Sequence, residues 1–361
     1  IEIVGEAARC DACDTCNINK TYSIQTLLPN DFDGGFCKGA PSFCMVYFFW
    51  HNGNYIKKML KGKMINRSTL DIQPMLPKFL FRTYVSGSDP MVDLRLFSYL
   101  PNPRINKATV TARLCDVEVD VRGAKPRELA DWLWDADARP LTDADKAPGS
   151  PTMREARTGF AGVLHKTDAF LEAHPFGTVP AAFSPDGKVG IFESNSIARA
   201  VARLSKNNHP IYGRDVFEAS RIDSFLDVSL VFARDTQKYL LMLAGKSISQ
   251  DLYDATEKAV ETYMTGIENA LERRAYLVGD AISLADVCFA AEMVEFALSH
   301  YNRSVLEDAG LVPLFDDSLK DRFPRTMAHL SRSLEHPAFA PDLGAHYAQI
   351  LAQVDTGNLR A

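Results

Sequence analysis

The spacing of hydrophobic and polar positions changes twice along the chain. Residues 1–90 show no sustained helical or strand period. After Met91, short alternating segments flank a helix-length segment, and beyond 207–215 apolar residues recur only at helical spacing. The pattern therefore predicts an extension at 1–90, an α/β domain at 91–206, an all-helical domain at 207–345 and a tail at 346–361.

The α/β domain opens with a strand, a helix and a second strand. Residues 92–97 and 117–121 alternate between apolar and polar, which is typical of strands. Asn102 is suited to cap the intervening helix, and Pro103 to occupy its first position. Two strands joined in this way are expected to be parallel.

Residues 166–204 carry the densest set of local signals. Two short apolar runs flank the Ser-Pro-Asp-Gly turn at 184–187, which predicts a hairpin. A helix follows from Ser194. A cis bond between Val179 and Pro180 would turn the backbone of Val179 toward solvent and offer it to an extended peptide. The helix N-terminus at Ser194 favours an anion, and Glu193 adds an acceptor for an ammonium group.

The all-helical region has apolar stripes over 215–240 and 251–274, where the aromatic positions are expected to be core residues. Ser283 and Asp286 form the pattern of a capping box at the start of another helix. A last helix opens at Phe323-Pro324 and ends before His336, which we interpret as a capping or packing residue.

The pattern F-L-x-x-x-P-F-G-x-V-P, followed by a turn and F-E-S-N-S-I, resembles the glutathione transferases and the transferase-like domain of translation elongation factor 1 gamma. The resemblance covers about residues 91–340, with one insertion at 123–165. It implies a thioredoxin-like domain (βαβ-ββα) followed by a helical bundle. It also implies a cytoplasmic homodimer that conjugates glutathione, its co-substrate, to an electrophilic apolar small molecule, as in detoxification.

The resemblance assigns residues to the parts of glutathione. Val179, before Pro180, would pair with the cysteinyl backbone, and Glu193 with Ser194 would bind the γ-glutamyl end. His165 and Lys166 match the pair that holds the glycine carboxylate of glutathione in some transferase classes. The residues expected to bind glutathione are therefore His165, Lys166, Val179, Pro180, Glu193 and Ser194. An alternative is the same fold with an inactive site.

The catalytic hydroxyl is the weak point of the resemblance. Only a thiolate attacks, so a transferase lowers the thiol pKa with a hydrogen-bond donor and a helix N-terminus. Where serine-type transferases carry their serine, four residues before Arg104, this chain has Leu100. We therefore take Ser98 and Tyr99 as catalytic candidates, and strand alternation places them on opposite faces. The missing serine favours the alternative function, a non-catalytic interaction module of the elongation factor 1 gamma type.

The insertion at 123–165 has two interpretations. It could be a surface insertion over the sheet edge, or Trp132 or Trp134 could wall an apolar substrate pocket. We prefer the surface insertion.

Composition and charge narrow the classes of partner that this chain could bind. A net charge of −6 gives no electrostatic case for nucleic acid or an anionic membrane, and no apolar run approaches the ~18 residues of a membrane helix. Only Cys115 and Cys288 lie outside the first 44 residues, so the main body is expected to be reduced and cytosolic.

The extension has its own alternatives. Cys10, Cys13 and Cys16 have a metal-ligand spacing, but position 20 is Lys where a ferredoxin-type cluster would continue with cysteine, and we predict no metal. One hypothesis is that Met91 is the initiator and 1–90 is disordered or untranslated. N-terminal analysis of the native protein tests it.

Overall fold

The computed structural model describes residues 92–156, 160 and 162–355, together with the backbone of six short strands among the first 65 residues. The chain divides into two units, Ile1–Pro90 and Met91–Ala361. Met91 and the three closely spaced cysteines lie outside the described residues.

The first unit contains two antiparallel sheets that the sequence pattern did not predict. One has the order β1-β4-β5-β6 and the other pairs β2 with β3. The bounds are β1(Tyr22–Gln25), β2(Phe32–Asp33), β3(Phe36–Cys37), β4(Tyr47–Trp50), β5(Ile56–Leu60) and β6(Lys63–Ile65).

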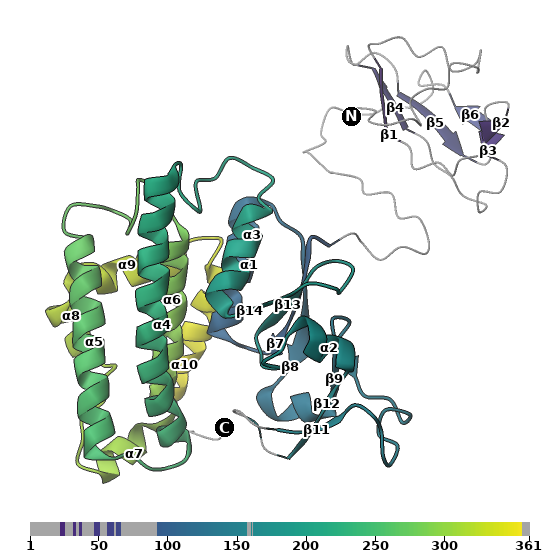
Figure 1. Ribbon diagram of the computed structural model, residues 1–361. Helices are drawn as coiled ribbons and strands as arrows, with labels where there is room; N and C mark the ends of the chain where they lie inside the picture. Colours follow the sequence, from purple (N-terminus) through teal and green to yellow (C-terminus); the bar gives the residue numbers. More distant parts are fainter. Residues whose placement is uncertain are drawn as a thin grey trace. The chain divides into compact units, whose positions relative to one another are not determined.

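The second unit begins with a mixed sheet of order β14-β13-β7-β8. β7 and β8 are parallel and joined by α1, as predicted, whereas β13 is antiparallel to both of its neighbours. The bounds are β7(Leu94–Tyr99), α1(Pro103–Cys115), β8(Val119–Ala124), β13(Ala181–Phe183), β14(Gly190–Phe192) and α3(Ser194–Arg203). Helices α1 and α3 pack against each other beside the sheet, as Figure 1 shows.

Local signals placed α1 well. The side chain of Asn102 accepts a hydrogen bond from the amide of Arg104, and Pro103 is the first helical residue, which confirms the predicted cap. Both strands extend two or three residues beyond the predicted ends, because β7 and β8 continue to pair as far as Tyr99 and Ala124.

The insertion builds a second sheet of order β10-β9-β12-β11. Trp134 in this sheet is fully buried, and its ring centroid lies 5.4 Å from that of Phe97 and 6.0 Å from that of Phe170. The interpretation as a surface insertion over the sheet edge is wrong, because the insertion supplies the core on the face that α1 and α3 leave open. The bounds are η3(Pro126–Asp131), β9(Trp132–Trp134), β10(Arg139–Pro140), β11(Met153–Glu155), β12(Val163–Lys166) and α2(Asp168–Ala173).

The rest of the unit is helical around α6, whose fourteen residues are all buried. The predicted capping box is confirmed: the carboxylate of Asp286 accepts from the amide and the hydroxyl of Ser283, each at 2.8 Å. The bounds are α4(Val216–Ala244), α5(Gln250–Ala270), α6(Leu284–Ala297), η4(Leu298–Asn302), α7(Arg303–Asp308), α8(Ser318–Arg322), α9(Pro324–Glu335), η5(Ala340–Gly344) and α10(Ala345–Asp355).

The predicted fold class, a thioredoxin-like domain followed by a helical bundle, is confirmed for the described part of the second unit. Helix α6 contacts α1, α4 and α9, so one core joins the sheet domain to the bundle. None of the helices in the described residues has the length and apolarity that crossing a membrane requires.

Candidate functional site

The strand register brings most of the predicted site residues to one end of the sheet. Ala181 pairs with Phe97 on one side and with Phe192 on the other. The next residue outward on each strand is therefore Pro180, Ser98 or Glu193. The Val179-Pro180 bond is cis, as the sequence suggested. Residues that are far apart in sequence thus meet at the start of α3.

The N-terminus of α3 offers unpaired backbone donors. Glu193 caps it with φ 65° and is exposed, and within the described chain its side chain makes no capping bond. Its carbonyl accepts from the amides of Ser196 and Ile197. The first two amides of the helix, those of Ser194 and Asn195, point to no described acceptor, as expected at a helix start. An anion such as a carboxylate suits this position.

The hydroxyl of Ser194 is held from inside the protein. The ammonium of Lys107, on α1, lies 3.1 Å from Ser194 Oγ, 2.7 Å from Asn195 Oδ1 and 2.6 Å from Glu292 Oε1. Lys107 is fully buried. Sequence reasoning missed Lys107, Asn195 and Glu292, because no motif links a lysine to a glutamate 185 positions away.

Arg104, in the first turn of α1, extends this charged cluster. Its guanidinium lies 3.2 Å from Glu292 Oε2 and 4.0 Å from Glu295 Oε1, and it also donates to Gln237. Burial alone would raise the pKa of Glu292, but the charges of Arg104 and Lys107 lower it overall. Burial raises the pKa of Glu295, whose Oε2 has no hydrogen-bond partner in the described structure.

The two catalytic candidates have different surroundings. Ser98 is fully buried, and its Oγ accepts a 2.9 Å hydrogen bond from Asn102, the cap of α1. Tyr99 is half-buried; burial and the carboxylates of Glu295 and Glu292 raise its pKa, against the effect of Arg104. Tyr99 therefore keeps its proton at neutral pH and can donate it in a hydrogen bond. Leu100, at the position of the family's serine, has no hydroxyl.

The residues predicted for the glycine end of glutathione lie on β12. His165 is buried, with Nδ1 3.0 Å from Thr152 Oγ1. Lys166 donates a 2.6 Å hydrogen bond to the carbonyl of Gly177, and its Nζ lies 4.5 Å from the centroid of the Trp134 ring. Lys166 and Trp134 line a cavity of about 400 Å³ that continues to Thr178, next to Val179. Lys166 is therefore placed beside the cis-proline loop, whereas His165 lies on the opposite face of β12, against Thr152.

Metal binding and cysteine chemistry find no support among the described residues. No group of three or more His, Cys, Asp or Glu side chains among them could hold a metal ion. Cys115 and Cys288 are free and buried, and burial raises the pKa of Cys288 to about 11. Neither thiol is suited to act as a nucleophile.

Comparison with known proteins agrees with the resemblance. Residues 223–337 match the family described as "Glutathione S-transferase, C-terminal domain". The chain is 34% identical over 137 residues to elongation factor 1-gamma 1 of Oryza sativa subsp. japonica, covering 37% of this chain and 31% of that protein. It is 31% identical over 130 residues to glutathione S-transferase F9 of Arabidopsis thaliana, covering 34% of this chain and 60% of that protein.

Among solved structures, the chain also matches glutathione transferase E6 from Drosophila melanogaster. The TM-score is 0.49, the sequence identity is 16%, and the match covers 74% of this chain and 98% of that one. The sequence matches confirm the predicted resemblance to glutathione transferases and to elongation factor 1 gamma. The chain spans only 31 to 40% of the length of the first two elongation factors it matches.

Proposed function

We propose that this glutathione transferase-like chain binds glutathione at the end of the sheet where β13 and β14 meet α3, and activates its thiol. The observation that carries the proposal is the register that brings Val179, Pro180 and Glu193 together. The backbone of Val179 would bind the cysteinyl unit. The free amides at the start of α3, with Glu193, would bind the γ-glutamyl end, and Lys166 would face the glycine carboxylate.

Thiol activation is assigned to Tyr99 and the start of α1. The thiol of free glutathione has a pKa of about 8.5, so a lower value requires groups that stabilise the thiolate. Tyr99 can donate a hydrogen bond to the sulfur, and the N-terminus of α1 adds the positive end of its dipole. The thiol proton passes to solvent, the sulfur bonds to the electrophilic carbon, and the leaving group departs with its electron pair. Ser98 has no place in this scheme, because it is enclosed.

The binding site is tested by calorimetric titration of reduced glutathione into the full chain. We expect micromolar-to-millimolar binding that weakens at least ~10-fold in Ser194→Ala and Glu193→Ala. Val189→Ala is the matched control, because Val189 is exposed at the other end of the hairpin. Equal binding by all variants would contradict the assigned site.

Catalysis is tested separately with a chromogenic aryl halide. Tyr99→Phe should lower turnover by about 10- to 100-fold while leaving glutathione affinity within a factor of two, since only the bond to the thiolate is lost. Unchanged turnover in Tyr99→Phe would remove Tyr99 from the mechanism.

A second function, a non-catalytic interaction module, is supported by one substitution: Leu100 stands where the family carries its serine. The contact with Lys107 does not block Ser194, because the hydroxyl accepts from the ammonium and keeps its own O–H to donate to a ligand. Several relatives are elongation factors 1-gamma, which favours a protein partner. A folded wild-type chain without glutathione binding or turnover would exclude the glutathione-dependent enzyme and leave the interaction module as the supported proposal.

We also propose that the protein is a cytosolic homodimer. Buried free thiols are compatible with a reducing compartment, and Val228, Val231 and Leu241 leave apolar surface exposed along α4. Sedimentation equilibrium of the full chain tests the dimer, with Val231→Lys as the variant expected to dissociate it.

A further inference from the structure

The side chain of Lys107 uses its whole hydrogen-bonding capacity inside the protein. An ammonium group has three N–H donors and no acceptor. Those of Lys107 reach Ser194 Oγ at 3.1 Å, Asn195 Oδ1 at 2.7 Å and Glu292 Oε1 at 2.6 Å. Lys107 is also fully buried. It can therefore act on a ligand only through the groups that it holds.

The side chain of Asn195 is equally closed to a ligand. Its Oδ1 accepts from Lys107 and, at 3.2 Å, from the thiol of Cys288. Its Nδ2 donates to the carbonyl of Leu226 and the hydroxyl of Ser229. Asn195 is fully buried as well. These contacts fasten the start of α3 to α4 and α6, and they occupy both polar atoms of the amide.

Ser194, unlike Lys107 and Asn195, keeps part of its surface exposed. It is 6% exposed at the first position of α3, next to the exposed Glu193. A hydroxyl has one donor and two acceptor positions, and Lys107 can only donate, so Ser194 Oγ is the acceptor in their contact. Within the described chain, Ser194 Oγ donates no hydrogen bond. Its O–H is thus left for an acceptor on a ligand.

Three donors without a described acceptor therefore lie in the first turn of α3. The O–H of Ser194 joins the backbone amides of Ser194 and Asn195. Hydrogen-bond donors at the positive end of a helix dipole favour a carboxylate and disfavour an ammonium group. The direction of the Ser194 O–H is the variable part of this set, because the amides are fixed by the backbone.

We propose that Lys107 is a positioning residue that determines which group of the ligand Ser194 recognises. By donating to Oγ, the buried ammonium keeps the O–H available to the α-carboxylate of a γ-glutamyl peptide. Without the ammonium, Oγ is no longer held as an acceptor. The oxygens of Asn195 and Glu292, each then one donor short, would compete for the O–H. This inference rests on the proposed glutathione site and adds a determinant of its specificity.

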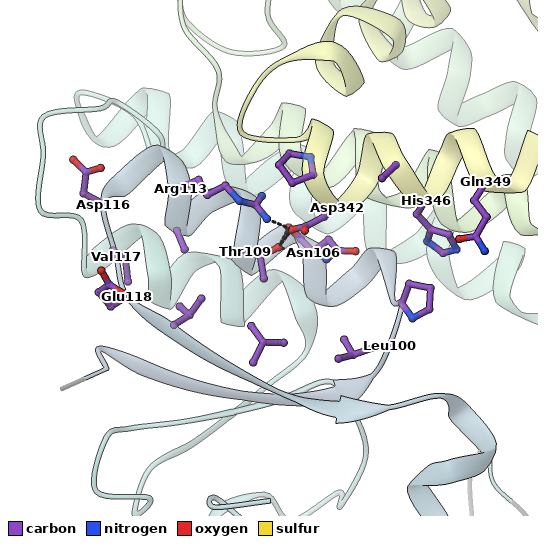
Figure 2. Close-up of a pocket in the computed structure, with 16 residues that line it drawn as sticks. Leu100, Asn106, Thr109, Arg113, Asp116, Val117, Glu118, Asp342, His346 and Gln349 are labelled. Atoms are coloured by element: carbon purple, nitrogen blue, oxygen red, sulfur yellow. Dashed lines mark hydrogen bonds and ion pairs between the residues drawn. The ribbon is translucent and has the colours of Figure 1, made fainter. Parts of the chain in front are cut away.

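A matched control lies on the opposite side of the same helix. Residues 107 and 109 are about 200° apart around an α-helix. The hydroxyl of Thr109 donates to Asp342, and Figure 2 shows this contact, which Arg113 shares, on the side of α1 that faces α10. Thr109→Val thus removes a buried hydrogen bond of α1 without touching Ser194.

The test compares two peptides that differ in one group. Reduced glutathione and 4-aminobutanoyl-cysteinyl-glycine, which is glutathione without its α-carboxylate, are titrated calorimetrically into the full chain. We expect the wild type and Thr109→Val to bind glutathione at least ~10-fold more tightly than the analogue. In Lys107→Met, the affinity for glutathione should fall at least ~10-fold and that for the analogue by less than about twofold, because only the carboxylate contact is lost. A purely structural role of Lys107 would weaken both peptides alike.

Ser194→Ala should reproduce the selective loss, and adding Lys107→Met to it should change nothing further, because the ammonium acts through the hydroxyl. If Lys107→Met does not fold, the double variant Lys107→Met with Glu292→Met takes its place, because it removes the buried carboxylate together with its partner. Parallel losses for the two peptides in a folded Lys107 variant, or an unchanged preference there or in Ser194→Ala, would overturn this inference alone. A folded wild type that binds neither peptide would overturn the proposed function and the inference with it.

Discussion

Lys107 on α1 and Glu292 on α6 form a fully enclosed ion pair, with 2.6 Å between Nζ and Oε1. The same ammonium reaches Ser194 at the start of α3. The sheet domain and the helical bundle are therefore joined by a charged contact next to the proposed glutathione site. Desolvating two charges is costly, so the pair depends on the surrounding hydrogen bonds to compensate.

Lys107→Met should lower the free energy of unfolding by about 3–5 kcal/mol, because it leaves Glu292 buried with only part of its compensation. The double variant Lys107→Met with Glu292→Met should be less destabilised than the sum of the two single variants. Urea unfolding of the wild type, the two single variants and the double variant gives the coupling energy of this double-mutant cycle. Additive losses would show that the contact is energetically unimportant.

Glu295→Gln should stabilise the protein at pH 7 by on the order of 1 kcal/mol. The pKa of Glu295 is raised by burial, so its ionised form is less favourable in the folded state than in the unfolded state. The destabilising effect is absent below the unfolded pKa and develops as pH rises through the folded pKa. The gain should therefore disappear near pH 4, as measured by urea unfolding at both pH values. A loss of stability at pH 7 would contradict this account.

Glu268 is expected to contribute to acid sensitivity. Its carboxylate accepts from the amide and hydroxyl of Thr326, each at 2.8 Å, at the start of α9. Burial would raise its pKa, but these hydrogen bonds and Arg325 lower it. Its contribution is thus present above the unfolded pKa of about 4.3 and is lost as pH falls through the folded value.

Glu268→Gln should therefore cost about 1–2 kcal/mol at pH 7 and less below pH 4. Thermal unfolding across this range provides the measurement. Glu272→Gln is the control, because Glu272 is exposed and, within the part of the chain that the structure describes, its carboxylate pairs with its neighbour Arg273. A pH-independent difference between Glu268→Gln and the wild type would argue against the linkage.

Trp134→Ala should lower the free energy of unfolding by about 3–5 kcal/mol, because the ring is fully buried among Phe97, Phe160 and Phe170. Met153→Ala, in the same sheet but 42% exposed, should change it by less than about 0.5 kcal/mol. Similar small effects for both variants would restore the surface-insertion interpretation of 123–165.

Local signals predicted much of this protein from its sequence alone. The cap at Asn102, the turn at 184–187 and the capping box at Ser283 each depend on residues within a few positions of one another. Such interactions depend only on short stretches of sequence. The helices and strands that they bound, and the resemblance to glutathione transferases, could therefore be predicted. The cis bond before Pro180 is a feature that the resemblance implied and that no local signal predicted.

Tertiary packing decided the rest, because it depends on contacts between distant residues. Alternation could place Ser98 and Tyr99 on opposite faces, but only packing shows that Ser98 is enclosed by Asn102. Composition could not reveal that Lys107 would be buried against Glu292, since an isolated lysine normally faces solvent. The core role of Trp134 likewise arises only once the insertion has packed against Phe97 and Phe170.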